Sequence, residues 1–149
     1  MNEPPTDDDP DAARALAGPP RDLSDLTRQL EGSTHGGPRH SMIYESIRRC
    51  VATDPGGAID TLADLPAGSH GPVLMAVSGL GRSALSPVWD RLDDDADTIR
   101  RAAAMVVCIW GQRGLLNDGE RADLSRRCED EHDPATRSAL AAAARRRQW

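Results

Sequence analysis

The sequence predicts an all-α protein on three observations. Alanine is abundant while the chain has no Phe and only one Tyr, so a core must be built from small side chains that let helices approach closely. Apolar residues recur at helical spacing in successive segments from Ser41 onward. The β-branched pair Val106-Val107 lies inside an alanine-rich helical pattern, and no segment has the branched and aromatic character typical of strands.

The first 40 residues are predicted to form an acidic, disordered tail, separate from a helical domain over 41–149. They contain two Pro-Pro pairs, and their eight acids against four arginines account for −4 of the net charge of −6. Few large apolar residues are present to offset the entropy lost on ordering. A short helix is possible at Leu23–Leu30, where three leucines share one face. The alternative is a docking segment that folds on a partner.

Three helices are expected between Ser41 and Gly81. In the first, Ser41 can cap the start and the run Asp54-Pro55-Gly56-Gly57 ends the helix. A short second helix over 58–65 ends at Pro66, and a third over 70–81 carries Pro72 in its first turn. The buried stripe of the first helix consists of Ile43, Ile47, Cys50 and Val51.

Four further helices are expected after Gly81. A helix over 84–92 is followed by acids at 93–95 and 97, which favour the start of an alanine-rich helix that Gly111 ends. A polar helix begins at Asn117 or Asp118, and Asp133-Pro134 opens a last helix closed by three arginines. The apolar faces of the first two are Leu85, Val88, Trp89 and Leu92, and Ile99, Ala102, Ala103, Val106 and Trp110.

The helices show signs of an internal repeat. Arg100 and Arg137 open similar small-residue helices 37 residues apart, and segment 70–81 resembles segment 100–111, 30 residues upstream and without the arginine. Periods of 20–50 residues built from helix pairs are typical of solenoids.

Two segments, DDADTIRRAAAMVVCIWG (94–111) and DPATRSALAAAA (133–144), resemble HEAT repeats, with an Asp a few residues ahead of an Arg that opens a small-residue helix. The resemblance extends more loosely over 41–149 and implies a short α-solenoid of about three helical hairpins that serves as a binding scaffold. It also implies that Asp95 or Asp97 with Arg100, and Asp133 with Arg137, hold neighbouring repeats together. An irregular helical bundle is the competing architecture.

Composition limits the cellular setting. A net charge of −6 provides no global basic field for nucleic acid, and the use of arginine for all eighteen basic residues is typical of a GC-rich, bacterial genome. Three cysteines without CxxC spacing indicate no disulfide framework. No signal peptide and no apolar stretch of about 20 residues is visible, so a cytoplasmic protein without a membrane span is expected.

Catalytic and metal-binding motifs are weak. His70 lies in a predicted glycine-flanked loop, PAGSHGP, without a nucleophile elbow, and is expected to be a solvent-exposed loop residue. Cys128 and His132 have i, i+4 spacing, but two ligands are not a metal site. The segment GLGRS (79–83) lacks the spacing and the lysine of a P-loop and is expected to be a helix–helix turn. No cofactor is expected.

These observations favour a non-catalytic module that binds a partner protein along a helical-repeat surface. One alternative is a nucleic-acid-associated regulator whose arginines line one side of the helices. Another is a small enzyme that uses His70. The terminal Trp149 would be costly to expose unless it packs on the fold or on a partner. The candidate partner-binding residues are Arg100, Arg101, Arg126, Arg127, Arg145, Arg146 and Trp149.

Overall fold

A computed structural model describes residues 23–33 and 37–145 of the chain, and every regular element in these ranges is helical. The predicted all-α fold class is therefore confirmed. The disorder predicted for residues 1–22 and the roles predicted for Arg146 and Trp149 lie outside the described residues. The described α-helices are α2 (Leu23–Glu31), α3 (Pro38–Thr53), α4 (Pro55–Thr61), α5 (Gly71–Gly79), α6 (Leu85–Arg91), α7 (Asp97–Gln112), α8 (Asp118–Asp130) and α9 (Pro134–Ala144); three short 3₁₀ turns are η1 (Leu62–Asp64), η2 (Ala67–Ser69) and η3 (Gly81–Ala84).

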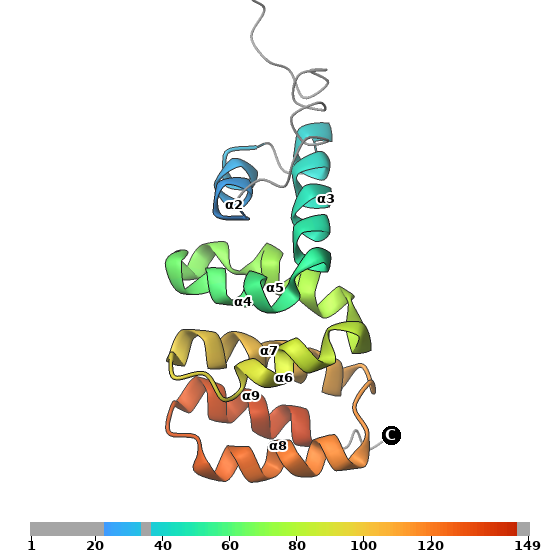
Figure 1. The fold of residues 1–149 in the computed structure, drawn as a ribbon, viewed down its shortest axis with the longest axis vertical. Helices are drawn as coiled ribbons and strands as arrows, with labels where there is room; N and C mark the ends of the chain where they lie inside the picture. The colour runs from blue at the N-terminus through green and yellow to red at the C-terminus, as the bar shows by residue number, and fades with distance from the viewer. Residues whose placement is uncertain (1–22, 34–36, 146–149) are drawn as a thin grey trace, which may run out of the picture.

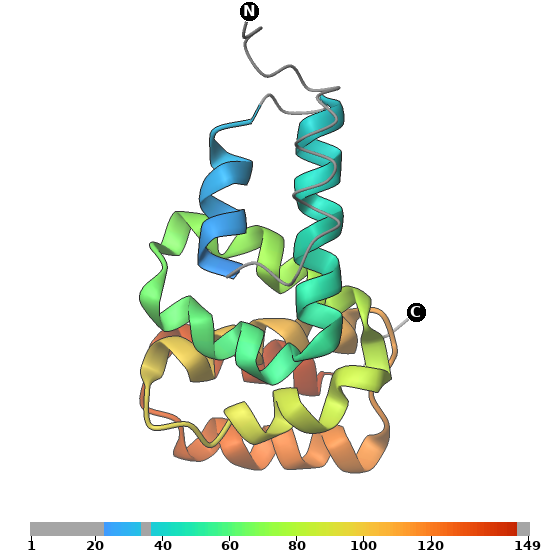
Figure 2. The same ribbon diagram turned by 45° about the horizontal axis from the view of Figure 1, so that its top comes forward.

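Successive helix pairs stack as layers. The pairs α4/α5, α6/α7 and α8/α9 follow one another down the long axis of the molecule (Figure 1). Helix α3 runs roughly across the direction of these pairs, and α2 lies beside α3 (Figure 2). One side of the stack is a continuous row, because α3 packs on α5, α5 on α7 and α7 on α9. The solenoid arrangement and membership of the HEAT family both stay predictions.

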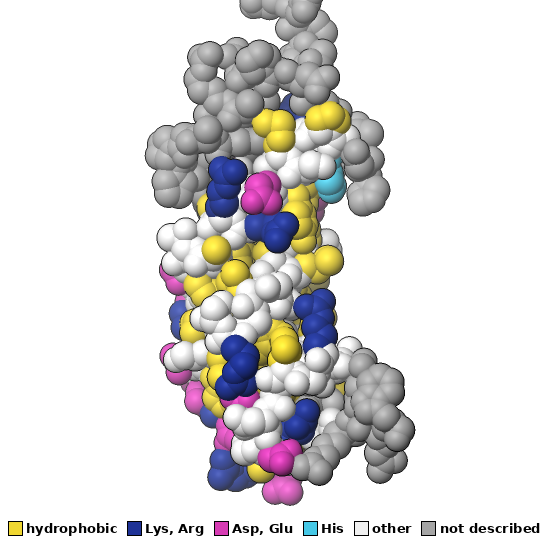
Figure 3. All heavy atoms as spheres, turned by 90° about the vertical axis from the view of Figure 1, so that its right-hand side faces the viewer, with side chains coloured by type: hydrophobic (Ala, Val, Ile, Leu, Met, Phe, Trp, Pro, Cys, Tyr) yellow, Lys and Arg dark blue, Asp and Glu magenta, His cyan; other side chains and the backbone are white. Residues whose placement is uncertain are grey.

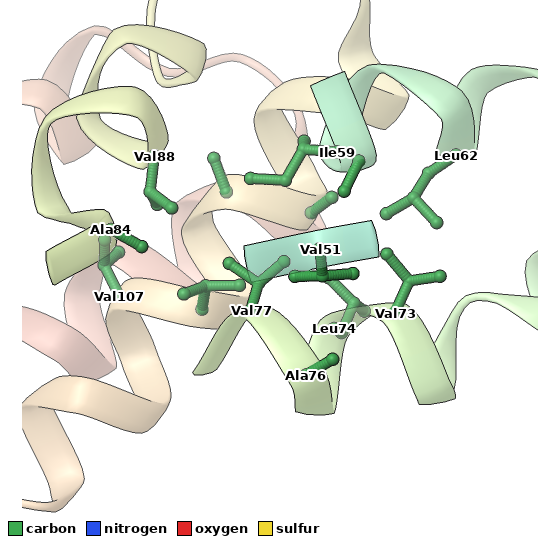
Figure 4. Close-up of a cluster of buried hydrophobic side chains, with 14 of the residues drawn as sticks. Val51, Ile59, Leu62, Val73, Leu74, Ala76, Val77, Ala84, Val88 and Val107 are labelled. Carbon is green, nitrogen blue, oxygen red and sulfur yellow. The ribbon is translucent and has the colours of Figure 1, made fainter. Parts of the chain in front are cut away.

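The core is built from short aliphatic side chains. Val51, Ile59, Leu62, Val77 and Val88, which come from five elements, converge between the first two layers (Figure 4). The predicted apolar face of α7 is buried in full, including Trp110 at 1% exposure. The Trp110 Nε1–H donates to the carbonyl oxygen of Ser78 on α5 at 2.9 Å, so this large buried side chain has a hydrogen-bond partner for its polar atom in the neighbouring helix pair.

Residues 23–31, which fall in the segment 1–40 expected to be disordered, form α2, at the place where a short helix was considered possible. Its three leucines are buried, Leu26 at 1% exposure, against α3 and neighbouring elements. The predicted boundary at residue 40 falls inside α3, which begins at Pro38 after the N-cap Gly37. Proline at the first helical position needs no hydrogen-bond partner for its nitrogen, so the helix starts there rather than at Ser41. The Ser41 amide donates to the Gly37 carbonyl oxygen within the first turn.

The N-termini of α7, α8 and α9 lie close to the capping residues predicted from the sequence. The Asn117 side chain accepts from the Glu120 amide, and the Glu120 carboxylate accepts from the Asn117 amide, a capping box. Asp133 caps α9 by accepting from the Thr136 amide, with Pro134 next. Asp94 accepts from the amide of Ala96, the N-cap of α7.

Gly111 has a different role from the one predicted. It was expected to end its helix, but α7 continues to Gln112, and the glycine with a positive φ of 74° is Gly114. Gly111 is buried against α9, where a Cβ atom would lie 2.7 Å from the carbonyl oxygen and 3.0 Å from the Cα atom of Ala143. Gly111 is therefore needed for the close approach of α7 and α9, and the expected stop signal lies three residues later.

We predict that Gly111→Ala destabilises the protein by about 1–3 kcal/mol, because the added methyl group must displace the α9 backbone. Gly79→Ala is the matched control: a Cβ at Gly79 meets nothing within 4 Å, so stability should change by less than about 1 kcal/mol. Urea unfolding followed by circular dichroism measures both. Equal stabilities for the two variants would contradict the close α7–α9 contact.

Candidate protein-binding surface

Hydrogen bonds and ion pairs connect each helix pair (layer) of the stack to the next one. Arg91 on α6 pairs with Asp60 on α4 at 2.9 Å, a separation of 31 residues. The Trp89 Nε1–H on α6 donates to Asp123 on α8 at 2.9 Å, 34 residues away. Arg82 in η3 makes two hydrogen bonds to Glu120 on α8, 38 residues away. Each of these contacts joins a helix pair to the pair that follows it along the chain.

The most buried of these contacts is the pair Arg100–Glu131. Arg100 on α7 is 8% exposed and Glu131, just after α8, is 9% exposed. The Arg100 Nε and Nη2 atoms each donate to one Glu131 carboxylate oxygen at 3.1 Å. Its Nη1 atom donates to the carbonyl oxygens of Asp94 and Asp95 at 2.9 and 3.1 Å. The hydrogen bond from Arg100 lowers the pKa of Glu131, which therefore stays ionised inside the fold.

The pairing implied by the HEAT resemblance is only partly present. Asp97 does pair with Arg100, within α7, but the partner of Arg100 in the next layer is Glu131, which no motif indicated. Asp133 pairs with Arg101 at 3.0 Å instead of with Arg137. Arg137 donates from its Nε atom to the Glu131 carbonyl oxygen at 2.9 Å. The reason is geometric: Asp133 is the N-cap of α9 and faces α7, where Arg101 reaches it.

The arginines predicted to contact a partner are mostly engaged within the fold. Arg100 is buried, and Arg101 pairs with Asp133. Arg126 and Arg127 both pair with Asp123, and Arg127 also pairs with Asp93. Arg145 is exposed just beyond α9. On the face drawn in Figure 3, the basic side chains are separated by other residues and form no continuous band.

A different set of exposed residues marks one side of the stack. Met75 on α5 is 65% exposed and Met105 on α7 is 45% exposed, although both are large apolar side chains. They lie 30 residues apart, at equivalent places in the weak repeat that relates segments 70–81 and 100–111. Gly71, Met75 and Gly79 form the exposed edge of α5 and are spaced four positions apart along the helix. Helix α5, in the middle of this row, therefore has an apolar exposed edge and contains no charged residue.

Two hollows flank α5. The α5–α7 groove, of about 550 Å³, has apolar walls that include Leu65, Leu74 and Met105, and carries His70 and Arg101 at its edge. The α3–α5 groove, of about 390 Å³, lies between α3 and the second half of α5. Its lining residues include Tyr44, Arg48, Arg49 and Met75. We call the two grooves together with the exposed edge of α5 the methionine surface.

His70 lies in the α5–α7 groove, where it has a structural contact. Its Nε2 atom is 3.0 Å from the Leu65 carbonyl oxygen, which can only accept, so Nε2 carries the proton in the neutral ring. The described residues that line this groove include the hydroxyl of Thr98 but no Ser, Cys or carboxylate.

Cys128 and His132 point to different partners. The Cys128 thiol contacts the Arg137 carbonyl oxygen at 3.5 Å, and His132 lies 3.6 Å from Asp97. Across residues 23–33 and 37–145, no group of three or more His, Cys, Asp or Glu side chains could hold a metal ion. Within the same ranges, no helix has the length and apolar character that a membrane span requires.

Comparisons with protein-family models, curated proteins and solved structures give no match for this chain. The surface must therefore be interpreted from its own geometry.

The apolar periodicity of the sequence predicts the helices that carry the methionine surface but not the surface itself. Tyr44, Met75 and Met105 each sit within an apolar helical pattern, where periodicity alone assigns apolar residues to the core. The one available signal was the 30-residue spacing of Met75 and Met105.

We predict that Arg100→Gln costs about 3–5 kcal/mol of unfolding free energy, because it leaves the buried Glu131 carboxylate without its ionic partner. Arg126→Gln, which removes an arginine whose side chain is 72% exposed, should cost less than about 1 kcal/mol. Chemical denaturation measures both values. Similar losses of unfolding free energy in the two variants would show that the Arg100–Glu131 pair is not the main interaction that holds α7 to the pair α8/α9.

The free energy of unfolding should also decrease as the pH is lowered. The hydrogen bond from Arg127, with those from Arg126 and Trp89, lowers the pKa of Asp123 to about 2, and hydrogen bonds from arginines lower the pKa of Glu120, Glu131 and Asp133. Carboxyl groups with a folded-state pKa below the unfolded value of about 4 stabilise the fold above that pH, and this stability is lost as the pH falls toward the folded value.

The melting temperature should therefore drop between pH 5 and pH 2. The gap in stability between the wild-type chain and Glu131→Gln should narrow over the same range, because a protonated Glu131 resembles Gln. Calorimetry across this pH range tests both expectations; a constant gap would contradict the role given to Glu131.

Proposed function

We propose that this protein is a non-catalytic interaction module that binds a segment of a partner protein on the methionine surface. The observation that carries the proposal is the pair of exposed methionines at equivalent places in successive layers, each bordering a groove. Methionine has a flexible, polarisable side chain that adapts to different apolar partners and is common on protein-binding surfaces. Large apolar side chains gathered in a solvent-facing region are typical of interaction sites.

The shape of the surface supports a protein partner over a small molecule. Small-molecule sites enclose most of the ligand surface, whereas these two grooves are shallow and lie side by side across α5. An extended or helical segment can cross both grooves and cover Met75 between them. The hydrogen bond from Trp110 to the Ser78 carbonyl oxygen joins α7 to α5, so little ordering of these two helices is needed when a partner binds.

The architecture and setting in this proposal are those predicted from sequence. The stacked pairs are treated as a short HEAT-like solenoid, in which a row of equivalent helices forms a binding face. A cytoplasmic location fits the three cysteines, all of which are free thiols. A nucleic-acid-binding stripe has less support, because Arg100, Arg101, Arg126 and Arg127 are paired with acids inside the fold.

The proposal is tested by recovering a partner with the immobilised full chain from its native cell extract and measuring its affinity. Met75→Ser combined with Met105→Ser should weaken binding at least about tenfold, because two apolar contacts are lost. Leu115→Ser is the matched control, since Leu115 is also a large exposed apolar residue but lies beyond α7, outside the methionine surface. No recovered partner, or equal weakening by the control, would contradict the proposal.

A further inference from the structure

The α3–α5 groove combines apolar and basic character. Tyr44 and Met75 provide large apolar side chains, one from each helix. Arg48, Arg49 and Glu45 line the α3 side, so this side carries one net positive charge. The side chain of Arg48 is 62% exposed and 3.6 Å from the Glu45 carboxylate. The α5 side has no charged residue. An occupant of this groove should therefore carry an apolar side chain next to negative charge.

This groove is locally basic, although the chain as a whole is acidic. Helices α3 and α5 together contain three arginines and one glutamate, whereas the whole chain has a net charge of −6. Charges farther away than about 10 Å are largely screened at moderate salt, so an occupant responds to the local arginines rather than to the overall charge. The groove thus selects an acidic segment.

One acidic segment is tethered next to the groove. Residues 1–22 contain six acids and two arginines, with acids at 7–9 and 11 followed by the apolar stretch that includes Leu16. They end where α2 begins at Leu23, and α2 packs on α3 (Figure 2). Leu16 lies seven residues before Leu23, so an extended tether between them can span about 23 Å, and the acids at 7–11 can reach farther. This reach is comparable to the length of the 16-residue helix α3, about 24 Å.

We propose that residues 1–22 bind the α3–α5 groove of their own chain, with Leu16 against Tyr44 and Met75 and with the acids at 7–11 near Arg48 and Arg49. The tether gives the segment an effective concentration in the millimolar range, so weak contacts are sufficient for occupancy. A partner that uses the methionine surface must displace the segment, and its apparent affinity is reduced accordingly. Only this regulatory consequence rests on the proposed function; the docking itself does not.

Photo-crosslinking of the full chain tests the docking. p-Benzoylphenylalanine is placed at position 16 instead of Leu16, the chain is irradiated without any partner, and the linked peptides are identified by mass spectrometry. We expect links within one chain to the peptides that carry Tyr44 and Met75. Arg48→Gln with Arg49→Gln should reduce the yield at least about threefold, because two exposed charge contacts are lost.

Arg126→Gln with Arg145→Gln is the matched control, since it removes the same charge from outside the groove and should leave the yield unchanged. Circular dichroism shows that both variants are folded. The proposal is overturned by links scattered over the molecule, by no links, by links only between two copies, or by equal effects of the two double variants. Because no partner is present, each of these outcomes leaves the partner-binding proposal to its own test.

Discussion

The buried Arg100–Glu131 pair sets the register of the last two layers. Two charges removed from water cost several kcal/mol each, and this cost is offset only when their hydrogen bonds are complete. Here the Arg100 guanidinium also donates to the carbonyl oxygens of Asp94 and Asp95, which precede α7. All three of its nitrogen atoms therefore donate hydrogen bonds within the protein. A shift of α9 along α7 would separate these groups and leave a charge buried alone. The pair therefore disfavours neighbouring registers more than it adds to stability.

This constraint is important because the core consists of small side chains that can pack in more than one arrangement. The alanine faces of α7 and α9 allow these helices to approach closely, and Gly111 has no Cβ atom that would clash with Ala143. Small side chains do not by themselves define one packing arrangement. Polar contacts between layers supply that definition, from Arg91–Asp60 at one end to Arg100–Glu131 at the other. Because α7 is fixed against α9 and also against α5 through Trp110, the positions of Met75 and Met105 are fixed as well.

Local signals predicted most of the helices, since a helix start depends on residues that are adjacent in sequence. Asp133 with Pro134, and Asn117 with Glu120, act as caps as expected. The cross-layer partners could not be predicted, because Glu131 and Asp123 belong to no motif and their partners depend on how the layers stack. Gly111 was misinterpreted for the same reason: a glycine near a helix end is compatible with a stop or with a close contact, and only the neighbouring helix distinguishes them.

The same limit explains why the candidate site changed from arginines to methionines. Paired charges such as Arg101–Asp133 and Arg127–Asp93 resemble a basic surface only when their acidic partners, 32 and 34 residues away, are ignored. Exposed apolar residues within a helical pattern resemble core until the packing of the other helices shows which face is left uncovered. Binding surfaces of stacked helices are properties of neighbouring layers rather than of any single segment.

Native-state amide hydrogen exchange tests the central claim most directly, since it measures whether the layers open together. If the polar contacts between layers join them into one unit, the most protected amides of α7 and α9 should exchange with opening free energies that agree within about 1 kcal/mol. If α8 and α9 exchange through a separate opening of much lower free energy while α7 stays protected, the last layer is not held by the Arg100–Glu131 pair and the account is wrong.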